Sequence, residues 1–370
     1  MTAQKAAAYK VRALDDTLPV VRYKKSDRDA VCALLRAASS RAASDRLICQ
    51  WDWKYDANPF NRDAEPYILL LKDGAQTIAM LGALPVRVVI AGLERWVAQT
   101  GDWVVHPDYR GRGLSRRLLS HCLADIPLRF AWANALSHEA AHSPTARSVP
   151  LAPLVHPLDV RRIVHRLTGN RWLSRWSGAV VERVRSLTRT PHRQPTLPGV
   201  SVAQATTFGP SSDVLWQHTC ADYPVMVVRD QRYLNWRFVE RPDARYTVLV
   251  AARGSELVGY LVLRVAEQVG MRWGYLVDFL VQHKSAALLA LLIDVGIEHL
   301  RQQEVAAISC RVTMSPYRET IRSRGFYPFR WGPQAYFYMR VELADPALQA
   351  FRDERQWFVT MGDGDLEMSF

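Results

Sequence analysis

A short stretch in the N-terminal half constrains the fold more than any other feature. Residues 105–119 read VHPDYRGRGLSRRLL. The β-branched and aromatic residues before it favour a strand, and Leu114, Leu118 and Leu119 after it recur at helical spacing. Gly111 and Gly113 let the backbone approach a ligand closely, so that the N–H groups of the turn and of the first helical turn face an anion. The stretch predicts a strand, a pyrophosphate-binding turn and a helix.

This loop resembles that of a known family. Arg110, Gly113 and Ser115 resemble the Arg/Gln-x-x-Gly-x-Gly/Ala loop of the GNAT acyl-CoA-dependent N-acyltransferases, with Ser at a position where the family has Gly or Ala. The resemblance implies acyl-CoA as co-substrate and no metal. It implies that CoA is bound by Val104, Val105, Arg110, Gly111, Arg112, Gly113, Leu114, Ser115, Arg116 and Asn134. The alternative is an arginine-rich turn that binds nothing.

The two halves of the chain echo each other. Trp53 and Trp236, each followed by a proline and a predicted strand, are 183 positions apart, and Asp102 and Asp278 are 176 positions apart. Such nearly constant spacing indicates a duplicated fold. In the second half the predicted strand 274–281 is followed by QHKSAA, which has no glycine, so we expect a degenerate copy without the same anion site.

Together these patterns predict the architecture. The fold class is α/β (α+β), with two tandem GNAT folds, each a mixed, mostly antiparallel sheet flanked by helices. We expect a GNAT domain with the acyl-CoA loop over residues 1–158, a connector over 159–199, a degenerate GNAT-like domain over 200–345 and a C-terminal tail over 346–370.

Composition supports an ordinary globular protein. The chain has 370 residues, of which 49% are hydrophobic, and its net charge is +12. Five scattered cysteines indicate reduced thiols, and residues 1–10 lack the apolar segment of a signal peptide. No window is apolar enough to span a bilayer. We therefore expect a cytoplasmic protein, with peripheral contact to the inner face of the membrane as a further possibility.

The connector carries much of the positive charge. Residues 159–199 hold nine arginines against two acids, and an apolar stripe follows helical spacing. The stripe comprises Trp172, Trp176, Val180, Val184 and Leu187. Residues 160–190 are therefore expected either to contact an anionic membrane or to pack as a linker helix on the two domains. We expect no nucleic-acid partner.

N-acyl transfer needs a group that accepts the proton of the attacking amine. Asp102 lies on the strand before the loop, where carboxylates of the resembling family often act, and a backbone N–H of residues 103–105 is the expected oxyanion donor. Because Asp278 repeats Asp102 in the second half, the alternative is that Asp102 anchors a turn.

Further candidates follow the next strand, residues 129–134. Asn134 matches a polar position that contacts the pantetheine arm in the family. His138 is a second catalytic candidate because the imidazole pKa suits acid–base chemistry, although a surface histidine is the commoner outcome. The family's usual acid is a tyrosine after this strand, but no tyrosine occurs between Tyr109 and Tyr223, so the general acid stays open.

Aromatic and acidic residues supply two more hypotheses. Trp51, Trp53 and Tyr55 lie where such folds place the wall of the acceptor site, and a core-packing role is the alternative. At the C-terminus, acids at alternate positions would share one face of an extended segment and bind an acceptor ammonium, although a solvated tail is the default. These acids are Asp363, Asp365 and Glu367.

The sequence thus predicts an acyl-CoA-dependent N-acyltransferase that acts on a primary amine. If the connector contacts membrane, the enzyme resembles bacterial ceramide synthases, which transfer a long acyl chain to a sphingoid base. The alternatives are acetylation of an amino sugar in cell-envelope polysaccharide synthesis, an aminoacyl-tRNA-dependent transferase, and a non-catalytic acyl-CoA-binding module.

Overall fold

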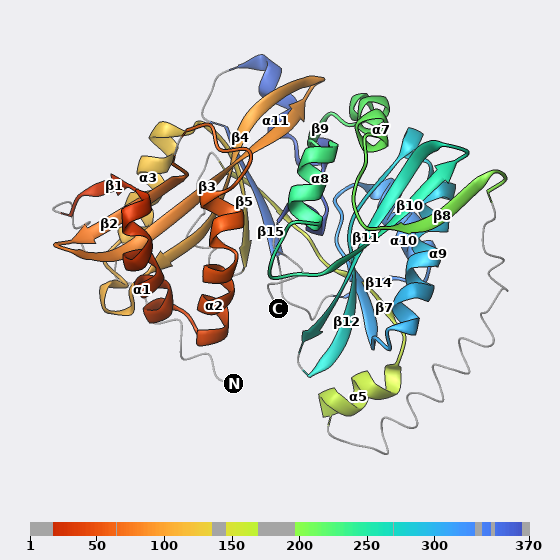
Figure 1. Ribbon diagram of the computed structural model, residues 1–370, viewed down its shortest axis with the longest axis horizontal. Coiled ribbons are helices and arrows are strands. Elements are labelled where there is room, and N and C mark those ends of the chain that lie inside the picture. Colours follow the sequence, from red (N-terminus) through yellow and green to blue (C-terminus); the bar gives the residue numbers. More distant parts are fainter. Residues whose placement is uncertain are drawn as a thin grey trace. The chain divides into compact units, whose positions relative to one another are not determined.

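The computed structural model describes residues 18–63, 65–134, 146–168, 197–268, 270–329, 335–341 and 345–364. The chain forms two compact units, shown in Figure 1. Unit 1 comprises residues 1–87, 95–148 and 338–348, and unit 2 comprises residues 88–94, 149–337 and 349–370. His138 and the stripe Trp172–Leu187 lie outside the described residues.

The first sheet has the strand order β1-β2-β3-β4-β5-β15-β6. The pairs β1–β2 and β2–β3 are antiparallel, whereas β4–β5 is parallel. Its elements are β1 (Val20–Arg22), α1 (Arg28–Ala38), α2 (Arg41–Cys49), β2 (Tyr67–Asp73), β3 (Gln76–Ile90), β4 (Leu93–Val105), α3 (Leu114–Asp125), β5 (Leu128–Asn134), β6 (Ala146–Pro150) and β15 (Ala335–Val341). Short turns of helix precede α1 (η1, Lys25–Asp27), follow α2 (η2, Asp52–Asp56) and precede α3 (η3, Pro107–Tyr109).

The core of unit 1 follows from its patterning. Strand β2 is buried along most of its length because its run of aliphatic residues is covered on both faces. Helix α3 packs on one face, where Leu114, Leu118 and Cys122 form one buried cluster with residues of β2 and β3 that include Leu69 and Leu81. On α1, the buried residues Val31, Leu34 and Leu35 recur at helical spacing.

The second sheet has the order β14-β7-β13-β12-β11-β10-β8, with one parallel pair, β12–β13. Its strands are β7 (Leu154–Pro157), β8 (Val200–Ala205), β10 (Tyr246–Arg253), β11 (Glu256–Gln268), β12 (Met271–Val281), β13 (Ala307–Cys310) and β14 (Tyr327–Pro328). Two further strands, β9 (Val225–Val227) and β16 (Trp357–Phe358), belong to the first sheet: they pair with each other in parallel, and β9 also pairs with residues 88–90 of β3.

Unit 2 also contains the helices α5 (Val160–Thr168), α7 (Ser211–Thr219), α8 (Gln231–Phe238), α9 (Ala286–Gln302), α10 (Ser315–Ser323) and α11 (Gln349–Arg352), with the turns η4 (Cys220–Asp222), η5 (Gln282–Lys284), η7 (Glu354–Gln356) and η8 (Met361–Asp363). Of these helices, α7 and α9 pack against β11 of the second sheet. The turn η6 (Pro346–Leu348) belongs to unit 1. Ser285 caps α9 by accepting a hydrogen bond from the Leu288 amide, and Gly296 lets this apolar helix approach Leu261 on β11. The mixed sheets confirm the predicted fold class.

Two strands depart from the expected boundaries at residues 158 and 345. Strand β7, which precedes the connector, pairs with β13 and β14 in the second sheet. Conversely β15, from the C-terminal half, lies between β5 and β6 in the first sheet. Each sheet is therefore completed by a strand from the other half of the sequence.

The default expectation of a solvated tail for residues 361–368 is wrong as far as Gly364. Trp357, Phe358, Val359 and Met361 are buried, and so is Asp363, which the sequence placed in a solvated acidic row. The cause is a set of buried arginine partners described below. Asp365 and Glu367 lie outside the described residues.

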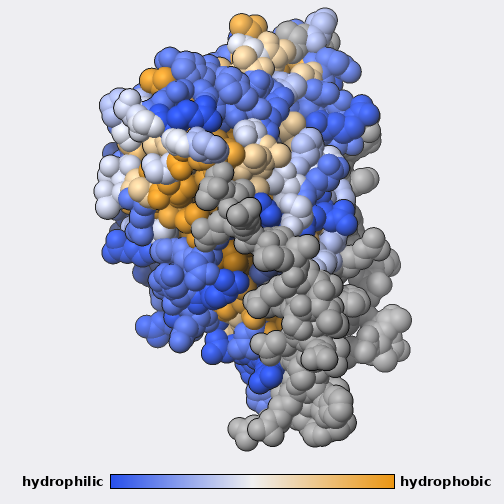
Figure 2. Space-filling view, turned by 90° about the vertical axis from the view of Figure 1, so that its right-hand side faces the viewer, coloured by the Kyte–Doolittle hydropathy of each residue, from blue (hydrophilic) through white to orange (hydrophobic). Residues whose placement is uncertain are grey.

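Among the described residues, no helix is long and apolar enough to cross a membrane. On the face of the molecule shown in Figure 2, hydrophobic residues gather in an area that lies between hydrophilic residues above and below it. Much of the surface in this view is therefore polar.

Candidate functional site

The parallel strands β4 and β5 diverge in unit 1. Their pairing runs from Ala98–Arg129 to Thr100–Ala131, and both strands continue beyond it, β4 to Val105 and β5 to Asn134. The divergence begins at Gly101 and Asp102, and Asp102 has a left-handed backbone with φ of 47°. A non-glycine residue held in that region is strained, and such strain gathers at functional sites.

The predicted anion-binding turn follows β4. After the turn η3, Gly111 and Gly113 have φ of 79° and 76°, and α3 begins at Leu114. Among the described residues, the backbone N–H groups of residues 111–116 donate no hydrogen bond. Together with the positive end of the α3 dipole, they form a concentration of donors suited to a phosphate.

The arginines of this turn differ in their contacts. Arg110 donates from Nε to the carbonyl of Val105 (3.3 Å) and from Nη2 to the carbonyl of Ala38 (3.0 Å), so it ties the turn to β4 and to the end of α1. Arg112 lies over the ring of Tyr109 at 4.7 Å. The guanidinium of Arg110 therefore holds the shape of the turn, whereas the Arg116 side chain is exposed.

Asp102 is held by two donors from one turn. The Tyr55 hydroxyl donates to Asp102 Oδ2 at 2.6 Å, and Lys54 Nζ lies 2.9 Å from the same oxygen. The side chains of Lys54 and Asp102 are 8% and 14% exposed, so this ion pair is largely shielded from water. Among the described residues, no donor contacts Oδ1 of Asp102.

The turn that supplies both donors is π-helical. In η2 the amide of Ala57 donates to the carbonyl of Asp52, five residues back. Turns of π-helix are rare in proteins, and those that do occur often lie at functional sites. In η2 two consecutive side chains, Lys54 and Tyr55, reach one carboxylate, which successive residues of a regular helix rarely do.

Aromatic packing fixes the position of Tyr55. Its ring lies 4.7 Å from that of Trp51, which lies 5.7 Å from that of Tyr23. Trp51 and Tyr55 are both 1% exposed, whereas Trp53 is half-buried. Trp51 is thus packed among core aromatic residues, and Tyr55 contacts Asp102 through its hydroxyl.

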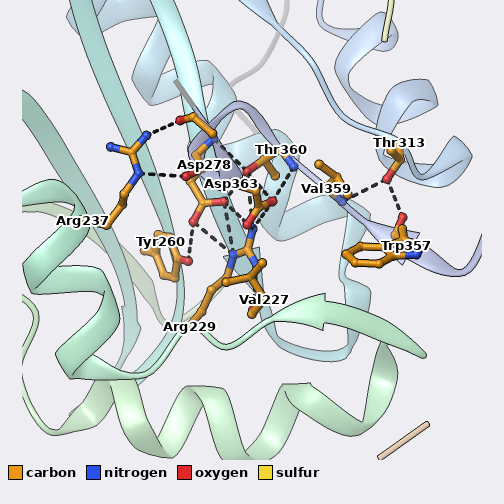
Figure 3. A network of polar contacts seen from close by, with 12 residues as sticks. Val227, Arg229, Arg237, Tyr260, Asp278, Thr313, Trp357, Val359, Thr360 and Asp363 are labelled. Atoms are coloured by element: carbon orange, nitrogen blue, oxygen red, sulfur yellow. Dashed lines mark hydrogen bonds and ion pairs between the residues drawn. The ribbon is translucent and has the colours of Figure 1, made fainter. Parts of the chain in front are cut away.

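The equivalent aspartate of the second half has a different environment, shown in Figure 3. Arg229 contacts both oxygens of Asp278, Tyr260 donates to Oδ2 at 2.7 Å, and Thr360 donates to Oδ1 at 2.7 Å. Arg229 also pairs with Asp363 at 2.9 Å. The side chains of Arg229 and Asp278 are 0% and 1% exposed, so Asp278 is shielded from water. Both of its carboxylate oxygens accept hydrogen bonds.

The C-terminal segment occupies the divergence in unit 2. Beyond the last β12–β13 pair, Thr360 bridges to Val312 and bonds Asp278 on β12, and the Thr313 amide donates to the Val359 carbonyl. The Arg237 guanidinium donates to the Gly362 carbonyl at 3.0 Å. The chain's own backbone therefore lies between the ends of β12 and β13.

The turn after β12 lacks glycine, as the sequence shows, but it keeps a left-handed backbone. His283 and Lys284 have φ of 53° and 50°. Non-glycine residues adopt this conformation only at a steric cost, which Gly111 and Gly113 in the turn of unit 1 avoid.

The predicted site residues are partly brought together. The stretch from Val104 to Arg116 forms the divergent strand end and the turn, with Asp102 beside it. Asn134 ends β5, and nothing is described of its side chain; His138 lies outside the described residues. Sequence reasoning missed Lys54, because its partner is 48 positions away; the one signal was a lysine amid the aromatic residues 51–55.

A family model matches part of the N-terminal half of the chain. Residues 20–137 match the family model described as an acetyltransferase (GNAT) domain. No curated protein sequence matches the chain.

Solved structures share the fold over most of the chain. The N-myristoyltransferase of Saccharomyces cerevisiae with bound myristoyl-CoA has a TM-score of 0.57 at 13% identity, covering 90% of this chain and 84% of its own. A GCN5-related N-acetyltransferase from Anabaena variabilis has a TM-score of 0.57 at 10% identity, with 87% and 72% covered. A probable N-acyltransferase from Enterococcus faecalis has a TM-score of 0.54 at 12% identity, with 88% and 73% covered. The two mixed sheets are consistent with the tandem fold of these proteins.

Proposed function

We propose, on the premise that residues 20–137 match the family model of an acetyltransferase (GNAT) domain, that unit 1 transfers an acyl group from acyl-CoA to a primary amine. The observation that carries the proposal is the divergence of β4 and β5 directly before a turn whose amides are unbonded among the described residues. Unit 2 has no comparable opening in its described part, since residues 357–363 lie in its divergence.

The turn is suited to hold the pyrophosphate of the acyl donor. Gly111 and Gly113 adopt a conformation that other residues resist, and the N–H groups that follow lie at the positive end of α3. Val104, Val105 and Asn134 flank the pantetheine arm in this proposal, and Arg112 and Arg116 add positive charge. A backbone N–H of residues 103–105 is the proposed oxyanion donor.

Asp102 is the proposed proton acceptor. As the amide C–N bond forms, the amine N–H proton passes to Oδ1 of Asp102, and the thioester C–S bond breaks with its electron pair on sulfur. The thiolate takes a proton from solvent, and Asp102 returns its proton to solvent. Positioning supplies much of the rate, because a neutral amine is already a good nucleophile.

The finer proposal is a long-chain donor and a lipidic amine of the sphingoid type. Two observations support it. Helix α5, which opens the basic connector, exposes Arg161, Arg162 and Arg166 opposite the half-buried Ile163 and Val164, as in helices that lie on anionic membranes. Among proteins of similar fold, the S. cerevisiae enzyme binds myristoyl-CoA. Acetylation of an amino sugar is the alternative that the assay separates.

The test uses the full-length protein with acetyl-CoA or palmitoyl-CoA and three amines: a sphingoid base, an amino sugar and a peptide N-terminus. Release of free thiol reports turnover, and calorimetry reports CoA binding. We expect turnover with palmitoyl-CoA and the sphingoid base. Thiol release only with acetyl-CoA and the amino sugar would replace the lipid proposal, and CoA binding without any turnover would indicate a binding module.

A matched pair of variants tests the turn itself. Gly113→Glu places a carboxylate and a strained side chain in the turn, so CoA binding should be lost while the far-ultraviolet spectrum is kept. Gly92→Glu makes the same change at another left-handed glycine, with open space around it, at the opposite end of β4. It should bind CoA like the wild type. Equal affinity for both variants would exclude the turn as the CoA site.

A further inference from the structure

We propose that Lys54 and Tyr55 are positioning residues that hold Oδ2 of Asp102 and present Oδ1 to the acceptor amine. The inference rests on the proposed function, since it assigns roles within the same site. It concerns two residues of η2 whose side chains converge on one oxygen atom.

Burial makes the contact of Lys54 specific. An ammonium group removed from water is costly unless a charge partner compensates it. Lys54 is 8% exposed, and its Nζ lies 2.9 Å from Asp102 Oδ2. An exposed pair of this kind would be worth little, but a shielded pair fixes both side chains. Lys54 therefore sets the position of the Asp102 carboxylate.

Tyr55 restricts the carboxylate from a second direction. Its hydroxyl donates to Oδ2 at 2.6 Å, and its ring is held by Trp51 at 4.7 Å. The ring also fills the space above Gly82 of β3, where a side chain would collide with it. The Tyr55 hydroxyl thus has little freedom to move with the Asp102 side chain. The Asp102 carboxylate therefore takes its orientation from the hydroxyl.

Lys54 and Tyr55 both contact Oδ2 of Asp102. This shared oxygen distinguishes a positioning role from a purely structural role. In unit 2 the donors of Asp278 are spread over both oxygens, and that carboxylate is 1% exposed. In unit 1 Oδ1 of Asp102 has no donor among the described residues, and the side chain is 14% exposed beside the divergence of β4 and β5. Asp278 is therefore shielded from water, whereas Asp102 keeps Oδ1 available for an incoming N–H group.

A double-mutant cycle tests the proposal. The variants are Lys54→Met, Asp102→Asn and the double variant, assayed by thiol release with the donor and amine that the wild type uses. Lys54→Met should lower kcat about tenfold while the KM for acyl-CoA stays unchanged. In the Asp102→Asn background the same change should cost less than about twofold, since Lys54 acts through Asp102. Lys54→Arg should restore most of kcat.

The control is Lys72→Met, which removes an ion pair with Asp27 elsewhere in unit 1 and should leave kcat unchanged. Equal fold losses for Lys54→Met in both backgrounds would show a structural role only and overturn the proposal. Full activity of Asp102→Asn would do the same, while leaving the acyltransferase proposal intact. By contrast, absence of both CoA binding and thiol release in the wild type would reject the acyltransferase itself.

A second cycle needs no substrate. Each single variant leaves one buried charge without its partner, whereas Lys54→Met/Asp102→Asn removes both charges. The urea midpoint of the double variant should therefore lie above the value expected from the sum of the single shifts. Strictly additive shifts would mean that Lys54 and Asp102 are not coupled, and the positioning role would be rejected even without an identified acceptor.

Discussion

The Tyr55 hydroxyl lies above the bare backbone of Gly82, in the space that a side chain on β3 would otherwise fill. The relationship joins η2 to the sheet beside Asp102, which the same hydroxyl contacts at 2.6 Å. The absence of a side chain at one strand position is thus a condition for the arrangement of the candidate site.

Gly82→Ala should displace Tyr55 and disturb Asp102. Overpacking a dense core costs about 1–3 kcal/mol of unfolding free energy, and the loss of the hydroxyl contact should lower kcat with little change in CoA affinity. Urea unfolding and calorimetry measure the two effects. Gly209→Ala is the control, because nothing lies within 4 Å of the added carbon there. Wild-type stability of Gly82→Ala would show that Tyr55 moves freely.

Arg229→Met should destabilise unit 2 strongly. Arg229 is 0% exposed and bridges Asp278 and Asp363, so its removal leaves two buried carboxylates without their cation. Breaking such a network costs about 3–5 kcal/mol, which urea unfolding measures. Arg355→Met, at an exposed arginine paired with Asp353, should cause no measurable change. Similar midpoints for the two variants would contradict the network in Figure 3.

Stability should fall at alkaline pH because of a buried thiol. Burial raises the pKa of Cys310 from 9.0 to about 12. Folding therefore favours the protonated thiol, and this contribution is complete below pH 9 and is lost as the pH rises toward 12. Cys310→Ala should flatten the decline of the unfolding midpoint over that range. A decline of equal slope in both proteins would assign it to other groups.

Helix α5 should bind anionic vesicles in the full-length protein. Each arginine near such a surface contributes about 1 kcal/mol, so Arg161→Glu should weaken co-sedimentation with phosphatidylglycerol vesicles about tenfold. Arg253→Glu changes the net charge equally at the exposed end of β10 in unit 2 and serves as the control. If the wild type ignores these vesicles, the lipid proposal loses its support, although the acyltransferase proposal stands.

The sequence was sufficient to predict features that depend on residues close together in the chain. The turn at 110–115 is recognisable because proline, arginine, two glycines and the apolar face of α3 are contiguous. The repeat was visible because equivalent elements keep nearly constant spacing. The burial of Lys54 was not visible, since a lysine is buried only when a distant residue, here Asp102, compensates its charge.

The burial of the C-terminal segment likewise could not be predicted from the local sequence. Alternating acids after Met361 are typical of a solvated tail, yet Asp363 is buried because Arg229, 134 positions earlier, meets it in the core. The strand exchange was equally hidden: β7 and β15 have ordinary strand patterns, and nothing local states which sheet they join. Such outcomes depend on pairing across the chain rather than on propensity.

The exchange of β7 and β15 has a consequence for any attempt to dissect this protein. A cut at the repeat boundary gives an N-terminal fragment that carries a strand belonging elsewhere and lacks one of its own, and the C-terminal fragment has the reciprocal defect. Neither sheet is complete in a fragment cut at that boundary, so the candidate site of unit 1 has to be studied in the full-length chain.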